Sequence, residues 1–268
     1  MNDKKTSGGG KDGHYARLRR AHREANPLPS SDNVVLYGLH TVRAAILNPA
    51  RKPLQLLATR NALARLELAD DTLARCPVEI VEPKAIDRLA GDGAVHQGIA
   101  LETLPLKPKP QTALGDTDLV LVLDQVTDPH NVGAILRSAV AFGAGALVTT
   151  ARHSPVESGV LAKAASGALE HIDHIEVRNL AEALETLSQS GFQTVGLDSE
   201  GPDILEQTVS GAKIALVLGA EGKGLRQKTR ETVDALARLD MPGAIKSLNV
   251  SNAAVLSLYV ARHAMVES

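Results

Sequence analysis

The sequence has little of several residue types, and each shortage excludes a class of protein. It has one cysteine, Cys76, which excludes an intramolecular disulfide and a metal site built on clustered cysteines. It has no tryptophan, two phenylalanines and three tyrosines, so few rings are available to stack on nucleic-acid bases. No apolar run approaches the roughly 20 residues that span a bilayer, and the start lacks the apolar core of a secretory signal. We therefore expect a globular cytoplasmic protein with no membrane or metal partner.

The chain does contain enough apolar residues for a core, 44% of 268, and its charge is unevenly distributed. Residues 1–26 carry seven Lys or Arg and three acids, a local charge of +4 that leaves −6 on the rest of a chain of net charge −2. Residues 1–31 have glycine and charge but no sustained apolar period, which predicts a disordered basic tail. This tail is either a solvated leader or an arm that contacts nucleic-acid phosphates.

Residues 32–104 alternate between strand and helix patterns, which predicts a small α/β domain. The segment 105–117 follows, with three prolines in its first six residues, and is predicted to be a semi-extended linker between domains. The predicted strands are 34–37, 54–59, 77–82 and 98–104, and the predicted helices lie between Gly38 and Pro49, over 61–69 and over 83–90.

Residues 118–268 resume the alternation as a second domain. Continuous apolar runs such as 119–123 and 214–218 are typical of strands covered on both faces, so a doubly wound parallel sheet is predicted. The predicted strands are 119–124, 146–150, 174–177, 193–198, 214–219 and 235–240, and the predicted helices are 131–143, 159–170, 180–190, a short one near 226–232, and a last one entered through 246–252.

Three polar corners lie where ligands bind in such sheets, beyond the carboxyl ends of strands. In the first, residues 123–144, we interpret Asn131 as a helix cap and Gly133 as a point of close approach. Arg137 follows on the second helical turn. Spacing alone leaves two readings of Arg137 open, a solvated helical arginine or a side chain turned toward a site.

The second corner, residues 216–227, has three glycines after a buried strand, which suggests a loop whose peptide groups face a ligand. It matches neither G-x-x-x-x-G-K-[ST] nor G-x-G-x-x-G. The third corner, residues 246–263, opens with four Ser or Asn residues before an apolar stretch, although one helix cap needs only one such residue. Those four are Ser247, Asn249, Ser251 and Asn252.

Together the three corners are specific. Asp-Pro-x-Asn-x-Gly with a following arginine, Gly-x-Glu-Gly-x-Gly, and Ser-Leu-Asn-Val-Ser, in that order, resemble the SpoU (TrmH) family of RNA ribose 2′-O-methyltransferases over residues 118–268. "LYGLHTVRAAI" and "HQGIALE" are similar to the substrate-binding domain of its ribosomal RNA members, especially the type that methylates a guanosine of large-subunit ribosomal RNA. The resemblance implies a trefoil-knotted, Rossmann-like SPOUT domain, an RNA partner and a homodimer whose sites are completed across the interface.

The resemblance also implies S-adenosylmethionine as cofactor, held at the knot mainly by main-chain groups of Gly219, Leu239 and Leu248. The reaction would displace the sulfonium by a ribose 2′-hydroxyl. The residues that match the family's catalytic set are Asn131, Arg137, Glu221, Ser247 and Asn249. We assign Arg137 to the adjoining phosphate and the developing alkoxide, because a guanidinium stays protonated and is a poor base. Glu221 is expected to orient Asn131 or Arg137.

Two positions depart from the family pattern, Asp240 and Asn252, and an acid at 240 beside the cofactor pocket would alter cofactor contacts. A ribose methyltransferase of transfer RNA and a non-catalytic RNA-binding protein with the same fold are the alternatives. The presence of Arg137 and Asn249 favours an enzyme. A nucleotide-dependent ligase or hydrolase is disfavoured, because "GAEGKG" lacks a hydroxyl residue after its lysine. The sequence does not identify the target nucleotide.

Overall fold

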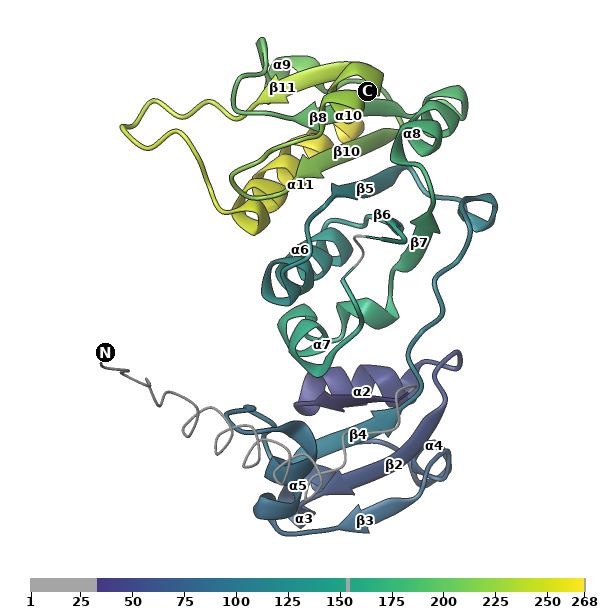
Figure 1. The fold of residues 1–268 in the computed structure, drawn as a ribbon. Coiled ribbons are helices and arrows are strands. Elements are labelled where there is room, and N and C mark those ends of the chain that lie inside the picture. The colour runs from purple at the N-terminus through teal and green to yellow at the C-terminus, as the bar shows by residue number, and fades with distance from the viewer. Residues whose placement is uncertain (1–32, 153–154, 268) are drawn as a thin grey trace, which may run out of the picture.

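The computed structural model describes residues 33–152 and 155–267, which form two lobes, each on its own β-sheet (Figure 1). The predicted basic tail, residues 1–31, lies outside the described residues. No helix in the described ranges is long and apolar enough to cross a membrane.

The N-terminal lobe has a four-stranded sheet in the order β1-β4-β2-β3. β4 is antiparallel to β1 and β2, and β3 is parallel to β2. The core contains fully buried aliphatic side chains, among them Leu36, Ile46, Leu56 and Leu101. The elements are β1 (Val34–Tyr37), α2 (Leu39–Leu47), β2 (Pro53–Ala58), α3 (Arg60–Ala64), α4 (Asp70–Leu73), β3 (Val78–Ile80), α5 (Pro83–Ala90) and β4 (Ile99–Thr103).

All four predicted strands of this lobe are confirmed, as are the helices before Pro49 and over 83–90. The single helix predicted over 61–69 is wrong. α3 ends at Ala64, Glu67 adopts a φ of 50°, and α4 starts separately at Asp70. A left-handed residue interrupts helical hydrogen bonding, and the hydrophobic period alone did not reveal it.

The segment between the lobes is extended apart from a short 3-10 turn, η1 (Gln111–Ala113). Lys109 pairs with the edge strand of the larger sheet: its amide donates to the carbonyl of His174 at 2.8 Å, and its carbonyl accepts from the amide of Glu176 at 2.9 Å. The segment is therefore held against the sheet edge.

The C-terminal lobe has a seven-stranded sheet in the order β7-β6-β5-β10-β8-β11-β9, and every pairing in it is parallel. Every residue of β5 is buried, as the continuous apolar run predicts. The strands are β5 (Leu119–Asp124), β6 (Ala146–Thr150), β7 (Asp173–Val177), β8 (Gln193–Leu197), β9 (Asp203–Ile204), β10 (Ile214–Gly219) and β11 (Ala235–Arg238).

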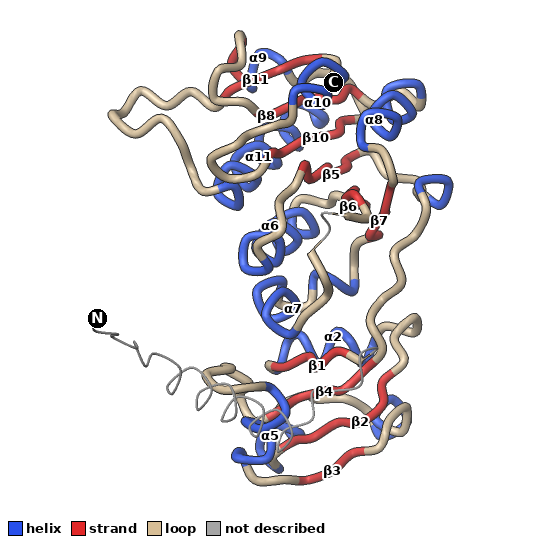
Figure 2. Tube along the Cα trace, viewed as in Figure 1, coloured by secondary structure: helices blue, strands red, loops and turns tan. Residues whose placement is uncertain are grey.

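Helices cover both faces of this sheet, so the predicted doubly wound α/β class is confirmed (Figure 2). One apolar core lies under α6, α7, α9 and α11, and a second lies under α8. The helices are α6 (Pro129–Ala141), α7 (Gly159–Ala165), η2 (Ala168–Glu170), α8 (Leu180–Gln189), α9 (Leu205–Thr208), α10 (Gln227–Thr232) and α11 (Val250–Glu267). The sequence pattern missed β9 and α9, and the helix predicted over 159–170 breaks at Ser166, whose φ is 52°.

The two lobes pack through α7, which lies against β1 and α2 (Figures 1 and 2). Ala162 of α7 belongs to the core of the N-terminal lobe. Gly159 allows the close approach, because a Cβ there would lie 2.4 Å from the carbonyl oxygen of Val35. Arg51, buried between the lobes, forms ion pairs with Glu157 at 2.6 Å and Glu170 at 2.7 Å.

Candidate active site

The three polar corners of the sequence meet at the carboxyl edge of the larger sheet. β5 and β10 are neighbouring parallel strands, and their last residues, Asp124 and Gly219, are paired. The loops that follow these strands, and the loop from β11 to α11, therefore leave the sheet at one edge. In open α/β sheets this edge is where ligands bind.

One carboxylate joins the three corners. Oε1 of Glu221, from the loop after β10, accepts hydrogen bonds from Nδ2 of Asn131 at 3.1 Å and from Nδ2 of Asn249 at 2.6 Å. Asn249 Nδ2 also donates to Oδ1 of Asn131 at 3.0 Å. The two amides are thus fixed by an acceptor that carries a full charge, which makes their hydrogen bonds stronger than neutral ones.

The start of α11 explains part of the Ser and Asn cluster. Oδ1 of Asn249 accepts from the backbone amide of Ser251 at 2.8 Å and from its hydroxyl at 2.6 Å, so Asn249 caps the helix. The same side chain reaches Glu221 through its amide nitrogen. Asn249 therefore joins the helix start to the network, Ser251 supports the cap, and Asn252 is exposed.

The expectation that Asn131 caps α6 is wrong. The cap is Asp128, whose Oδ1 accepts from the amide of Asn131 at 2.8 Å. Pro129 occupies the first helical turn, where its fixed φ and missing N–H cost nothing, so the helix begins before Asn131. Because Asn131 is not needed as a cap, its side chain is available to the network.

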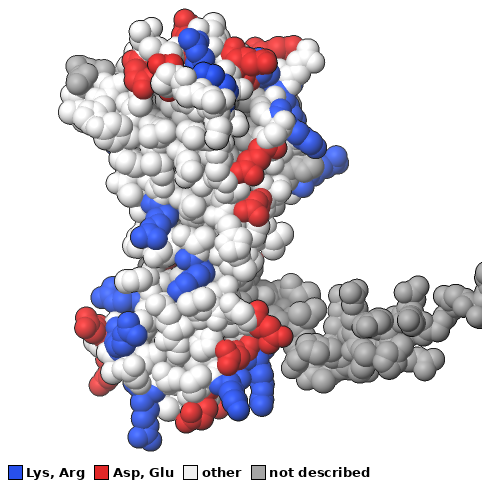
Figure 3. Space-filling model, turned by 90° about the vertical axis from the view of Figure 1, so that its left-hand side faces the viewer, with Lys and Arg blue, Asp and Glu red and all other residues white. Residues whose placement is uncertain are grey.

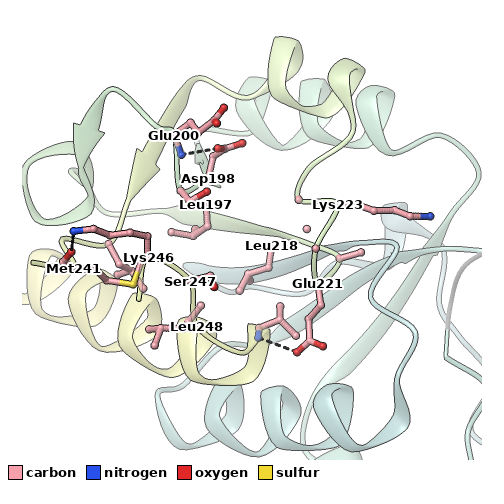
Figure 4. Close-up of a pocket in the computed structure, with 18 of the residues that line it drawn as sticks. Leu197, Asp198, Glu200, Leu218, Glu221, Lys223, Met241, Lys246, Ser247 and Leu248 are labelled. Atoms are coloured by element: carbon pink, nitrogen blue, oxygen red, sulfur yellow. Dashed lines mark hydrogen bonds between the residues drawn. The ribbon is translucent and has the colours of Figure 1, made fainter. Parts of the chain in front are cut away.

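A cavity of about 460 Å³ lies beside this network (Figure 4). Gly219, Leu239 and Leu248, the residues matched to the cofactor site, all line it, and so do Ser247 and Glu221. The loop from Gly219 folds back tightly. A Cβ on Gly219 would lie 2.2 Å from the carbonyl carbon of Gly224, and Gly222 and Gly224 both have positive φ. The glycines thus give the cavity a wall made of backbone.

Charged side chains that the sequence did not single out border the same cavity. Asp198 and Glu200 follow β8, and Asp198 forms an ion pair with Arg230 of α10. The backbone amide of Glu200 donates to Oδ1 of Asp198 at 2.9 Å, as Figure 4 shows. The available signal was an acid at the end of an apolar strand pattern, since Asp198 is the last residue of the strand predicted over 193–198.

Two lysines also border the cavity, Lys223 and Lys246, and Lys246 Nζ donates to the carbonyl of Met241 at 2.7 Å. Asp240, expected beside the cofactor pocket, lines a neighbouring hollow that shares Leu239, Met241 and Leu248 with this cavity. Within the ranges that the structure describes, no cluster of three His, Cys, Asp or Glu residues is arranged to hold a metal.

Arg137 is the one predicted site residue that lies apart. It is exposed on α6, outside the stripe formed by Ile135, Leu136 and Ala139, and it lines a hollow with His40 and Arg43 of the N-terminal lobe. The six residues from Asn131 to Arg137 cover about 9 Å of helix and turn the side chain to a different face. Its guanidinium has no hydrogen bond or ion pair to any described residue.

Comparison with known proteins gives two family matches. The profile of the SpoU rRNA Methylase family matches residues 118–259, and that of RNA 2'-O ribose methyltransferase substrate binding matches residues 35–109. A Pseudomonas putida protein named 23S rRNA (guanosine-2'-O-)-methyltransferase RlmB is 38% identical over 237 residues, 84% of this chain and 94% of that protein. The Vibrio cholerae protein of the same name is 35% identical over 246 residues, 85% and 96% of the two chains.

Solved structures share the fold across both lobes. The SpoU methyltransferase AviRb from Streptomyces viridochromogenes, in complex with AdoMet, has a TM-score of 0.73 at 20% identity, covering 94% of this chain and 99% of that one. An AdoMet-bound rRNA methyltransferase from Sinorhizobium meliloti has a TM-score of 0.73 at 22% identity, covering 97% of each chain. Given the profile match over 118–259 and relatives more than 30% identical along almost their whole length, the chain belongs to the SpoU rRNA methylase family.

Proposed function

We propose that this protein transfers a methyl group from S-adenosylmethionine to a ribose 2′-hydroxyl of RNA, at a guanosine of large-subunit ribosomal RNA. The observation that carries the proposal is the network of Asn131, Glu221 and Asn249 beside the cavity that Gly219 and Leu248 line. The names of relatives 35–38% identical to the chain support the substrate.

The cavity fits the cofactor. Its wall of peptide groups between Gly219 and Gly224 suits adenine edges and a carboxylate, and Leu239 and Leu248 suit apolar parts of the ligand. When bound, S-adenosylmethionine would supply a methyl group on a positively charged sulfur. A nucleophile would bond to the methyl carbon, and the sulfur would leave as a neutral thioether. Ser247, from the loop that leads into α11, also lines the cavity and offers a hydroxyl donor.

The nucleophile needs help from the protein, because a ribose hydroxyl attacks poorly until it loses its proton. Arg137 is suited to bind the phosphate beside the target ribose through two N–H groups and to stabilise the charge that develops on the 2′-oxygen. A phosphate oxygen or a water accepts the proton. Glu221 holds Asn131 and Asn249 in fixed orientations toward the ribose.

A homodimer completes this proposal. Arg137 does not line the cavity of its own chain, so a second copy would supply it. The surface of α11 suits such an interface, since its Leu256 and Tyr259 are 45% and 52% exposed. Leu248, just before the helix, is 41% exposed and lines the same hollow. Figure 3 shows a wide area without charged side chains on this side of the large lobe. Apolar patches of this kind mark protein interfaces.

Mixing two inactive variants tests the shared site. In a homodimer of Arg137→Ala every site lacks the arginine, and in a homodimer of Glu221→Ala every site lacks the glutamate. If the halves come from different chains, a mixed dimer regains one site of two, and a randomly exchanged mixture regains about a quarter of the wild-type activity. If both residues act within one chain, the mixture stays inactive, and the shared site is refuted.

The activity itself is tested by mapping 2′-O-methyl groups in total RNA from cells with and without the gene. Loss of one guanosine methylation in large-subunit ribosomal RNA is the expected result, and purified protein with S-adenosylmethionine should restore it. Loss of a transfer RNA methylation would reassign the substrate. If no ribose methylation is lost, a non-catalytic RNA-binding protein is favoured. The presence of Arg137 and Asn249 argues against that alternative.

The RNA is proposed to bind both the N-terminal lobe and the basic tail. Deleting residues 1–26 is expected to weaken RNA binding and to flatten its dependence on salt, because seven cationic side chains are lost. If the dependence of RNA affinity on salt is unchanged, the tail makes no contact with RNA phosphates.

We also propose a domain division, a knot and a location for this protein. The chain is divided into a tail (1–31), a substrate-binding domain (32–104), a linker (105–117) and a methyltransferase domain (118–268). The last domain is knotted near the loop that leads into α11, as the family resemblance implies. The cytoplasm is the proposed location, in keeping with an RNA substrate.

A further inference from the structure

A second cavity opens at the same carboxyl edge of the large sheet. It has a volume of about 590 Å³. It lies between the end of β6, the turn from β7 into α8, and the start of α10. The loop after β10 borders both cavities, since Gly224 lines the first and Arg226 lines the second. The lining residues of the second cavity are Thr150, Ala151, Arg152, Arg178, Asn179, Leu180 and Arg226.

The lining carries three guanidinium groups and no carboxylate. Arg226 is already neutralised, because its Nε donates to Oδ1 of the buried Asp124 at 2.6 Å. Arg152 and Arg178 are exposed, and neither forms a hydrogen bond or ion pair with any residue in the ranges 33–152 and 155–267. Two uncompensated positive charges therefore face one hollow, an arrangement that attracts an anion.

The start of α8 borders the same cavity. α8 has 10 residues, and its cap, Asn179, lines the cavity, accepts a hydrogen bond from the amide of Ala181 at 3.1 Å and donates one to Glu182 of the first turn at 2.7 Å. The amides of the first helical turn and the helix dipole favour a negative group at this end.

An independent observation is the hydroxyl of Thr150. The residue is 6% exposed, and Oγ1 is buried without a hydrogen-bond partner among the described residues. The preceding residue, Thr149, points to the other face of the strand, where its hydroxyl lies 2.7 Å from Nε2 of His174. A buried hydroxyl without a partner is costly, so a ligand acceptor on the cavity side accounts for it.

We infer that this second cavity binds a phosphodiester group of the RNA substrate, with Arg152 and Arg178 as cationic ligands and Thr150 as a neutral donor. The inference rests on the proposed function for the identity of the ligand. Because one loop separates the two cavities, a phosphate held by Arg178 fixes the path of the strand relative to Glu221 and the cofactor cavity. Free inorganic phosphate shares this chemistry, so the test separates the two sources.

The test measures binding of the full chain to a labelled single-stranded RNA of about 16 nucleotides over a series of salt concentrations. Arg178→Gln should weaken binding about tenfold and reduce the slope of log affinity against log salt by about 0.7, the value for one phosphate contact on a single strand. Thr150→Val keeps the shape of the side chain and removes the hydroxyl. It should weaken binding severalfold and leave the slope unchanged.

The matched control is Lys213→Gln, which removes one exposed positive charge just before β10, at the opposite edge of the sheet. If Arg178→Gln behaves like Lys213→Gln, the inference fails. If Thr150→Val binds RNA as tightly as the wild type, the hydroxyl has no ligand and the site as assigned is wrong.

A second arm identifies the source of the anion. The melting temperature is compared in sodium phosphate and in sodium chloride of equal ionic strength. Protection by phosphate in the wild type but not in Arg178→Gln, together with unchanged RNA binding, would assign the site to free phosphate and overturn the RNA assignment. The methylation map of cells with and without the gene tests the proposed function separately, so failure of one leaves the other standing.

Discussion

Two polar clusters join distant parts of this chain, and they differ in burial and in charge balance. Between the lobes, the side chain of Arg51 is fully buried against two carboxylates, those of Glu157 and Glu170. At the carboxyl edge of the large sheet, Glu221 holds two neutral amides near the surface, and no described cation pairs with it. In the first cluster every charged group has a partner of opposite sign, whereas Glu221 in the second has none among the described residues.

The difference indicates which cluster stabilises the folded state and which one orders the candidate active site. A buried arginine with two acceptors stabilises only if every partner stays in place, so the cluster between the lobes fixes their relative position. An exposed network contributes little to folding, and its order serves geometry at the site. Substitutions in the two clusters should therefore separate stability from turnover.

The largest effect is expected for Arg51→Ala. Breaking a buried ion pair and leaving its acids unpaired costs about 3–5 kcal/mol, which should appear in the free energy of unfolding in urea and as a larger radius of gyration in solution scattering. Exposed Arg65→Ala is the control. An Arg51→Ala variant as stable and as compact as the wild type would contradict a role in docking the lobes.

The same variant has a predicted pH dependence. Burial raises the pKa of the Glu157 carboxyl, and the nearby Arg51 guanidinium opposes that rise. Without Arg51 the folded-state pKa rises further above the unfolded value, so the folded state binds the proton more tightly than the unfolded state. The stability lost in Arg51→Ala should therefore be greatest near pH 8 and partly recovered near about pH 5.

The next largest effect is expected for Arg137→Lys, which compares two arginines in opposite settings. Arg137 is exposed and unpaired among the described residues, so the change should leave the free energy of unfolding within about 0.5 kcal/mol of the wild type. Turnover should fall about a hundredfold, because lysine cannot bind a phosphate through two parallel N–H groups. The KM for S-adenosylmethionine should stay constant, since Arg137 lies outside the cofactor cavity. Near-normal turnover of Arg137→Lys would refute the proposal that Arg137 binds a phosphate through two parallel N–H groups.

The strands that lead into the candidate site were predictable from the sequence, but the cluster between the lobes was not. The apolar runs at 119–123 and 214–218 predicted strands covered on both faces of a parallel sheet, as observed. That these two strands are neighbours, so that the loops after them meet, is known only from the structure. The pairing of Arg51 with Glu157 and Glu170 was not predictable, because more than 100 residues separate the partners and no local pattern specifies the contact. The position of Arg137 was left open for a related reason, since helical spacing gives its face on α6 but not what that face meets.

The smallest effect is expected for Glu221→Gln, which keeps the size of the side chain and one oxygen acceptor but removes the charge. Asn131 and Asn249 then lose charge-assisted hydrogen bonds, and turnover should fall about tenfold while the free energy of unfolding changes by less than about 0.5 kcal/mol. Glu185→Gln, an exposed acid on α8, is the matched control and should change neither quantity. A Glu221→Gln variant that loses stability but not turnover would show that this network is a structural contact, like the cluster between the lobes. The two clusters would then not differ in role.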